Sequence, residues 1–200
     1  MNDLEIDYPD GATPLDLNEM GGLIPDYITT QGELNTLERD NVLEAQTWAF
    51  QKPRTGMLNA RFAFGLHKRM FSRVWKWAGT QRRSGKTIGV DWTQIPTELA
   101  GLFDNTKYWT QHATYSPDEI AIRFHRKLAW IHSFANGNGR HARLMTDLLL
   151  VSGGQQPFSW GMNTSPGVLE TQGPLRREYI AALRESDHED YARLLQFARS

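Results

Sequence analysis

Apolar residues recur every three or four positions along most of this 200-residue chain. That spacing places them on one face of a helix, so it predicts a series of amphipathic helices. The clearest start is at Ser116, where Pro117 and Glu119 add a first-turn proline and a capping-box acid. The predicted helices begin near residue 35 and then span about residues 59–77, 96–111, 117–132, 140–151, 175–184 and 188–199.

The period of the pattern changes between residues 80 and 95, where short apolar runs flank a Ser84-Gly85 turn. Such an arrangement predicts a small β-hairpin. Prolines and glycines are frequent in the first 28 positions, which predicts an irregular segment there. We therefore predict an all-α class with one small hairpin, in which an acidic arm, residues 1–34, packs on a body formed by residues 35–200.

The composition is that of an ordinary globular domain, and 200 residues are enough to bury a core. The chain has no cysteine, which excludes a disulfide framework, thiol catalysis and cysteine-ligated zinc. The first twenty residues contain acids but no lysine or arginine, unlike a secretory signal peptide. The longest uncharged stretch, residues 148–169, is interrupted by glycines and prolines and does not read as a membrane span. We expect a cytoplasmic protein.

The net charge of −1 conceals a strong segregation of charge along the chain. Residues 1–50 contain 11 acids and one base, whereas residues 51–150 contain 16 bases and 6 acids. The middle of the chain is therefore expected to face an anionic partner. That partner can be a nucleotide, a nucleic acid, a phosphorylated substrate or the chain's own acidic N-terminal region.

The segment with the clearest chemistry is residues 132–143, HSFANGNGRHAR. Its Gly-Asn-Gly turn begins a predicted helix, and backbone N–H groups at such a turn favour an anion. Arg140 and Arg143 share one helical face and can bind further phosphate oxygens. His132 ends the preceding helix, and an unperturbed pKa of ~6.5 leaves its imidazole able to accept a proton. Together these residues indicate phosphate-directed transfer to a hydroxyl group.

Plainer interpretations exist for the same residues. GNGRHA matches the G-x-G-x-x-A pattern of dinucleotide sites, but a helix rather than a strand precedes it. A Gly-Asn-Gly turn can also simply connect two helices, and Phe134 is expected to plug into the core. His125 and His132 lack the further ligands of a zinc site. The tryptophans are expected in the core, so direct binding of nucleic acid is not expected.

The segment HSFANGNGRHAR resembles the signature of the Fic (Fido) family, H-x-F-x-(D/E)-G-N-G-R-x-x-R. The phrases WKWAG, YIAAL, ELNTLERDNVLEAQTWAF and IGVDWTQIP extend the likeness, and the last two resemble the group called mobile mystery protein B. The resemblance implies an all-helical Fic fold with a hairpin flap. It also implies transfer of a nucleoside monophosphate, usually AMP from ATP with Mg²⁺, to a Ser, Thr or Tyr hydroxyl of a target protein.

The resemblance also implies a role for each matching residue. His132 would deprotonate the attacking hydroxyl, while Arg140 would hold the β- and γ-phosphates and Arg143 the γ-phosphate. The metal-holding acid of the family is Asn136 here, whose carbonyl oxygen offers Mg²⁺ no negative charge. The phosphate cradle would be formed by Gly137, Asn138 and Gly139. The flap that aligns the target segment by main-chain pairing would be formed by Thr87, Ile88, Gly89 and Val90.

Many Fic proteins are silenced by a glutamate in the form (S/T)-x-x-x-E-(G/N), and this string does not occur cleanly here. Glu38 is a candidate, so we hypothesise that the acidic N-terminal region restrains Arg143. The alternative is that Glu38 is only the capping-box acid of a helix beginning at Asn35.

Three readings of the function follow. The first is protein adenylyltransfer, and the second is other chemistry at the same site, either phosphoryl transfer or removal of AMP. The third is a catalytically silent module in a toxin–antitoxin-like pair with a helix-turn-helix protein.

Overall fold

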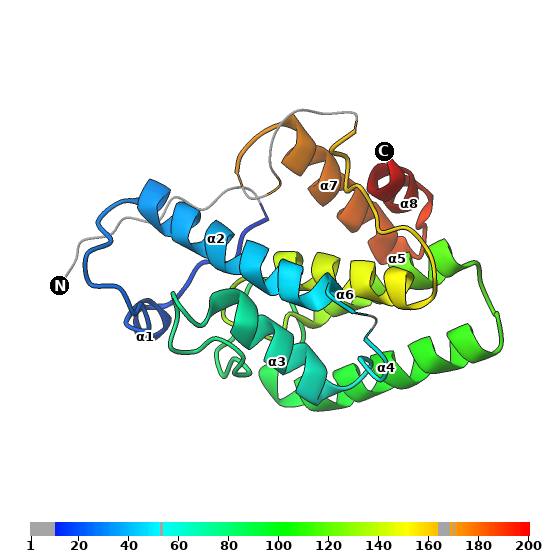
Figure 1. The fold of residues 1–200 in the computed structure, drawn as a ribbon, viewed down its shortest axis with the longest axis horizontal. Coiled ribbons are helices and arrows are strands. Elements are labelled where there is room, and N and C mark those ends of the chain that lie inside the picture. Colours follow the sequence, from blue (N-terminus) through cyan, green and yellow to red (C-terminus); the bar gives the residue numbers. More distant parts are fainter. Residues whose placement is uncertain (1–10, 53, 164–168, 170) are drawn as a thin grey trace.

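The computed structural model of the chain describes residues 11–52, 54–163, 169 and 171–200. Its centre is the antiparallel pair of α5 (Pro117–Ile131) and α6 (Asn138–Ser152), joined by the loop of residues 132–137. Helix α2 (Gln31–Phe50) packs on α3 (Ala60–Phe71) and crosses α6, while α4 (Ile95–Gln111) packs along α5 (Figure 1). The remaining helices are α1 (Leu17–Met20), α7 (Pro174–Glu185), α8 (Ala192–Arg199) and the 3₁₀ turns η1 (Trp92–Gln94) and η2 (Ser186–His188).

The buried apolar side chains form two clusters on either side of the central pair. The larger cluster joins α2, α3 and α4 to α5 and α6, and the smaller one joins α7 and α8 to α5. The all-α prediction is confirmed, and the described residues have the layered helix-on-helix packing expected of that class. None of the described helices combines the length and apolarity that crossing a membrane requires.

Helix α2 begins four residues earlier than the sequence pattern predicts. Thr30 is its N-cap, since the Thr30 hydroxyl accepts from the Glu33 N–H and the Glu33 carboxylate accepts from the Thr30 N–H. This reciprocal capping box satisfies two N–H groups that the helix end would leave open. Glu38 therefore lies inside the helix, and its predicted role as a capping acid is wrong. The predicted boundary at residue 34 falls within the first turn of α2.

The predicted β-hairpin is wrong, because residues 80–91 form irregular turns with no strand among them. The cause is the buried Arg82, whose guanidinium donates to the carbonyls of His132, Ser84 and Val90. A side chain thus satisfies carbonyls that a strand ladder would otherwise serve. Residues Thr87 to Val90 consequently follow the edge of the α5–α6 loop as an irregular segment.

Acids of the N-terminal region pair with bases of the middle of the chain. The structure pairs Glu19 with Lys86, Glu38 with Arg140 and Glu44 with Arg73. Acids of residues 1–50 therefore meet bases of residues 51–150 within the fold, as the segregated charge predicts.

Candidate active site

The loop between α5 and α6 owes its shape to three residues. His132 ends α5 in the left-handed conformation (φ 55°, ψ 60°), which histidine adopts more readily than most side chains. Phe134 is 1% exposed and stacks on His67 with ring centroids 3.6 Å apart, so the predicted core plug is confirmed. The buried Asn138 side chain donates to the Phe134 carbonyl and accepts from the Phe134 N–H, at 2.8 and 2.9 Å.

The first turn of α6 is built to receive an anion. Its N-cap is Gly137, at φ 77°, and no side chain caps the helix. A Cβ at Gly137 would lie 2.5 Å from the Phe71 ring, so only glycine fits there. Because helix N-termini carry unpaired N–H groups and a positive dipole end, this turn favours phosphate.

A cavity of about 560 Å³ opens in front of this turn. Its size is within the range of small-molecule sites and suits a nucleotide. The cavity brings together most of the residues singled out from the sequence, namely Glu38, Ile88, His132, Asn136, Gly137, Asn138, Gly139, Arg140 and Arg143. Thr87, Gly89 and Val90 do not line it. Ile88 is 41% exposed, whereas Val90 is buried.

The two arginines lie one turn apart on α6. Arg140 Nη1 is 2.7 Å from Glu38 Oε2, and its guanidinium lies over the Phe71 ring. The other carboxylate oxygen of Glu38 accepts from the Trp75 indole N–H at 2.6 Å. The guanidinium of Arg143 lies over the Tyr179 ring, 5.5 Å from its centroid. The ion pair of Glu38 is therefore with Arg140, one turn before the Arg143 named in the sequence hypothesis.

His132 is prepared to accept a proton at Nε2. Its Nδ1 lies 3.3 Å from the Ala129 carbonyl, which can only accept, so we place the ring hydrogen on Nδ1. Burial lowers the pKa of His132 to about 4, and the positive charges of Arg82 and Lys86 act in the same direction. At neutral pH the imidazole is therefore uncharged, with a free electron pair on Nε2.

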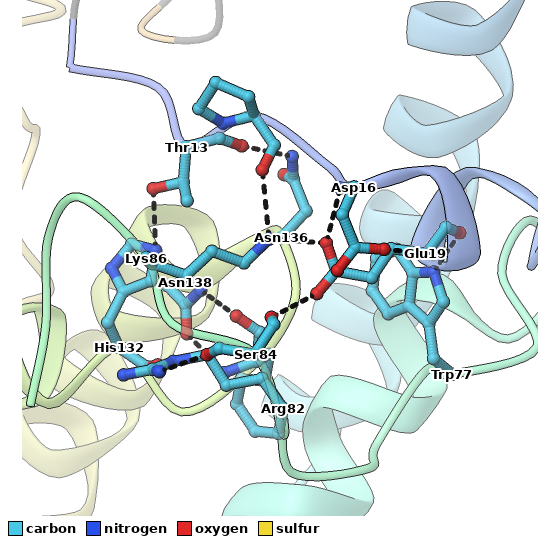
Figure 2. Close-up of polar contacts among 12 residues, drawn as sticks. Thr13, Asp16, Glu19, Trp77, Arg82, Ser84, Lys86, His132, Asn136 and Asn138 are labelled. Carbon is cyan, nitrogen blue, oxygen red and sulfur yellow. Dashed lines mark hydrogen bonds and ion pairs between the residues drawn. The ribbon is translucent and has the colours of Figure 1, made fainter. Parts of the chain in front are cut away.

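The group facing that electron pair is Thr13, which the sequence reading missed. Thr13 Oγ1 lies 2.8 Å from His132 Nε2 (Figure 2). The Thr13 carbonyl accepts from the Asn136 side-chain amide at 3.4 Å. No periodicity or motif marks Thr13, because its segment is irregular and lies 119 residues from His132 in the chain.

The residues present do not form a protein-held magnesium site. The side-chain oxygen of Asn136 accepts from the Gly137 N–H, and its nitrogen faces the Thr13 carbonyl. Within the described part of the chain no three His, Cys, Asp or Glu side chains gather as metal ligands. Magnesium in proteins relies on carboxylate and phosphate oxygens. The predicted metal position thus lacks the negative charge that would hold the ion.

Comparison with known proteins matches residues 57–150 to the Fic/DOC family. The chain is 33% identical over 96 residues to protein adenylyltransferase Fic of Drosophila virilis and 32% identical to that of Aedes aegypti. The matched part is 46% of this chain. It spans only 20% of the Drosophila virilis protein and 19% of the Aedes aegypti protein.

Solved structures resemble nearly the whole chain at low sequence identity. The Bartonella tribocorum effector BepC with bound AMPPNP aligns with a TM-score of 0.70 and 16% identity, covering 92% of this chain and 97% of that one. A Bartonella quintana Fic domain with bound ADP gives 0.69 and 17%, covering 87% and 86%. Fic-1 of Caenorhabditis elegans gives 0.60 and 22%, covering 90% and 51%. The described residues therefore have the all-α Fic fold, and residues 57–150 match the model of the Fic/DOC family.

Proposed function

We propose that this chain is a protein adenylyltransferase that moves AMP from ATP to a Ser, Thr or Tyr hydroxyl of a target protein. The observation that supports it best is a single cavity lined by a neutral base, His132, and by the uncapped N-terminus of α6. A base and an anion site facing one space are what hydroxyl attack on a phosphate requires. The relatives named protein adenylyltransferase Fic, and the nucleotides bound in the Bartonella structures, favour the same chemistry.

Each residue has a stated part in this reaction. The hydroxyl oxygen bonds to the α-phosphorus of ATP while its proton passes to His132 Nε2. The bond from that phosphorus to the bridging oxygen breaks, and pyrophosphate leaves. The first-turn N–H groups of α6 hold phosphate oxygens, and Arg140 and Arg143 neutralise the leaving group. Residues 87–90 dock the target beside the loop, with Ile88 facing the cavity. Magnesium would arrive with the nucleotide rather than on a carboxylate of this chain.

The test is transfer of label from ATP marked at either the α- or the γ-phosphate to proteins of a cell lysate, with Mg²⁺ present. Parallel reactions contain GTP, CTP or UTP in place of ATP, because the residues assigned in the loop contact phosphates and do not select the nucleotide base. We expect α-label on protein. Label from the γ-phosphate alone would mean phosphoryl transfer, the second reading that Asn136 keeps open. Nucleotide binding by calorimetry with no transfer would mean either removal of AMP from a modified protein or a silent binding module.

We also propose that this chain is related to the group called mobile mystery protein B, which its sequence resembles. That resemblance implies a helix-turn-helix partner protein encoded alongside this chain. Co-expression and co-purification with such a partner is the direct check. A complex that lowers transfer would support a toxin–antitoxin arrangement.

Glu38→Gln is expected to raise nucleotide affinity by about 10-fold, or about 1.4 kcal/mol. Glutamine keeps an oxygen for the Trp75 indole but removes the charge that holds Arg140, and charge-assisted hydrogen bonds are worth about 1.5–3 kcal/mol. Calorimetry of ATP binding measures the change. The same variant should unfold at lower urea concentration without nucleotide, since Arg140 is then unpaired.

The matched control is Glu44→Gln. Glu44 lies on α2 as Glu38 does, and the change removes its exposed ion pair with Arg73. It should leave nucleotide affinity unchanged. If Glu38→Gln binds ATP no more tightly than the parent chain, Glu38 does not restrain Arg140.

A further inference from the structure

The N-terminal arm enters the candidate active site and places one hydroxyl on the base. Thr13 is 5% exposed, and its Oγ1 lies 2.8 Å from His132 Nε2. The Ala129 carbonyl accepts the Nδ1 hydrogen, so Nε2 accepts and the Thr13 hydroxyl donates. This is the contact that a general base makes with an attacking hydroxyl before proton transfer.

Two contacts from the site hold the backbone that follows this hydroxyl. The Asn136 side-chain amide donates to the Thr13 carbonyl at 3.4 Å, and Lys86 Nζ donates to the Pro14 carbonyl at 3.0 Å (Figure 2). Lys86 is itself paired with Glu19 of α1, in a contact with little exposure to solvent. These contacts fix Thr13 from two loops that are distant in sequence, as an enzyme fixes a substrate segment.

Asn136 gains a function from this arrangement. A carboxylate at that position would face the Thr13 carbonyl with an oxygen and could donate nothing to it. The amide supplies the N–H that the carbonyl needs. The departure from the acid of the Fic signature is thus matched to the presence of the arm.

Thr13 also lines the same cavity as the phosphate-binding groups. Gly137, Arg140 and Arg143 border that space together with Thr13 and His132. A nucleotide bound at the α6 N-terminus would therefore share one cavity with an already positioned hydroxyl.

We propose that Thr13 is an acceptor within the chain itself, so that the protein nucleotidylates its own N-terminal arm. This inference rests on the proposed nucleotidyltransferase function and names a substrate for it. The Thr13 oxygen bonds to the α-phosphorus of ATP, and its proton passes to His132 Nε2. The bond to the bridging oxygen breaks and pyrophosphate leaves. The resulting phosphodiester has no hydroxyl proton to donate to His132, so the arm loses that contact after modification.

The experiment incubates the full chain with ATP labelled at the α-phosphate, followed by intact mass and peptide mapping. We expect one added AMP, located on Thr13. Because the reaction is intramolecular, the first-order rate should not change with protein concentration. Thr13→Ala should lower the self-label by about 10-fold or more, since the positioned hydroxyl is lost, and Thr13→Ser should restore it.

The matched control is Thr47→Ala, which changes an exposed threonine on α2 whose hydroxyl donates to the Leu43 carbonyl one turn away. It should self-label as the parent chain does. Lysate proteins are present in a parallel reaction. If they are labelled while the arm is not, or if self-label maps elsewhere, the Thr13 inference fails and the proposed function stands. If nucleotide binds and no protein at all is labelled, the proposed function fails and takes this inference with it.

Discussion

His132→Ala is expected to lower nucleotidyl transfer by about 10²–10⁴-fold, the usual contribution of a general base. ATP binding should change little, because the proposed function assigns the phosphates to the α6 N-terminus and its arginines and not to the imidazole. Transfer is measured as α-label on lysate protein, and binding by calorimetry. His112→Ala, at the exposed end of α4, is the control and should transfer normally.

The pH dependence of the same reaction follows from the environment of His132. Burial lowers its pKa to about 4, so the imidazole keeps its free electron pair well below neutral pH. The acid limb of kcat/KM should therefore fall near pH 4, where protonation removes the base, and not near 6.5. Retention of transfer by His132→Ala within a few-fold of the parent would show that another group takes the proton.

The helices and the site loop could be predicted because their signals are local. The capping residues at Ser116 and the 3.6-residue spacing act within one turn, and α5 begins where they indicate. The segment HSFANGNGRHAR likewise contains its base, its turn and its arginines within twelve positions. Folding of this short segment therefore places those residues at one cavity.

The features that could not be predicted depend on partners far away in the chain. Residues 80–91 carry the turn signal of a hairpin, but Arg82 satisfies carbonyls as distant as that of His132. The capping box predicted at Asn35 and Glu38 is not the start of α2, because Thr30 and Glu33 form the capping box one turn earlier. The hydrogen bonds of Glu38 with Trp75 and Arg140, and of Thr13 with His132, join residues that only tertiary packing brings together.

Acidification is expected to lower the free energy of unfolding between about pH 6.5 and pH 4, because histidines are buried in the neutral form. His67, His125 and His141 are at most 1% exposed. Burial lowers the pKa of His125 to about 3 and that of His141 to about 4, and it lowers the pKa of His67 well below its ordinary value. The unfolded chain binds these protons near pH 6.5 and the folded chain does not. Stability is thus complete above 6.5 and falls as the pH drops.

The buried Asp147 changes the stability with pH in the opposite direction, but it is one group against three buried histidines. Burial raises its pKa to about 7, although the Trp160 and Phe158 N–H groups donate to it. A folded state that holds this proton more tightly loses stability as the pH rises from about 4 to 7. Asp147→Asn should remove that loss and steepen the net fall of stability on acidification.

The buried histidines should nevertheless have the larger effect, so that stability falls as the pH drops. One pKa unit is worth about 1.4 kcal/mol. Protonation of these histidines in the unfolded chain should therefore lower the free energy of unfolding by several kcal/mol at about pH 4, a large share of a typical stability of about 5–15 kcal/mol. Urea unfolding followed by circular dichroism at pH 7, 6, 5 and 4.5 measures this as a falling midpoint. His141→Gln should flatten the dependence by about one proton, since glutamine can donate to the Ala63 carbonyl that His141 contacts but does not titrate. The exposed His188→Gln should leave the slope as it is. A midpoint that stays constant from pH 7 to 4.5 would mean that the folded protein admits these protons without opening.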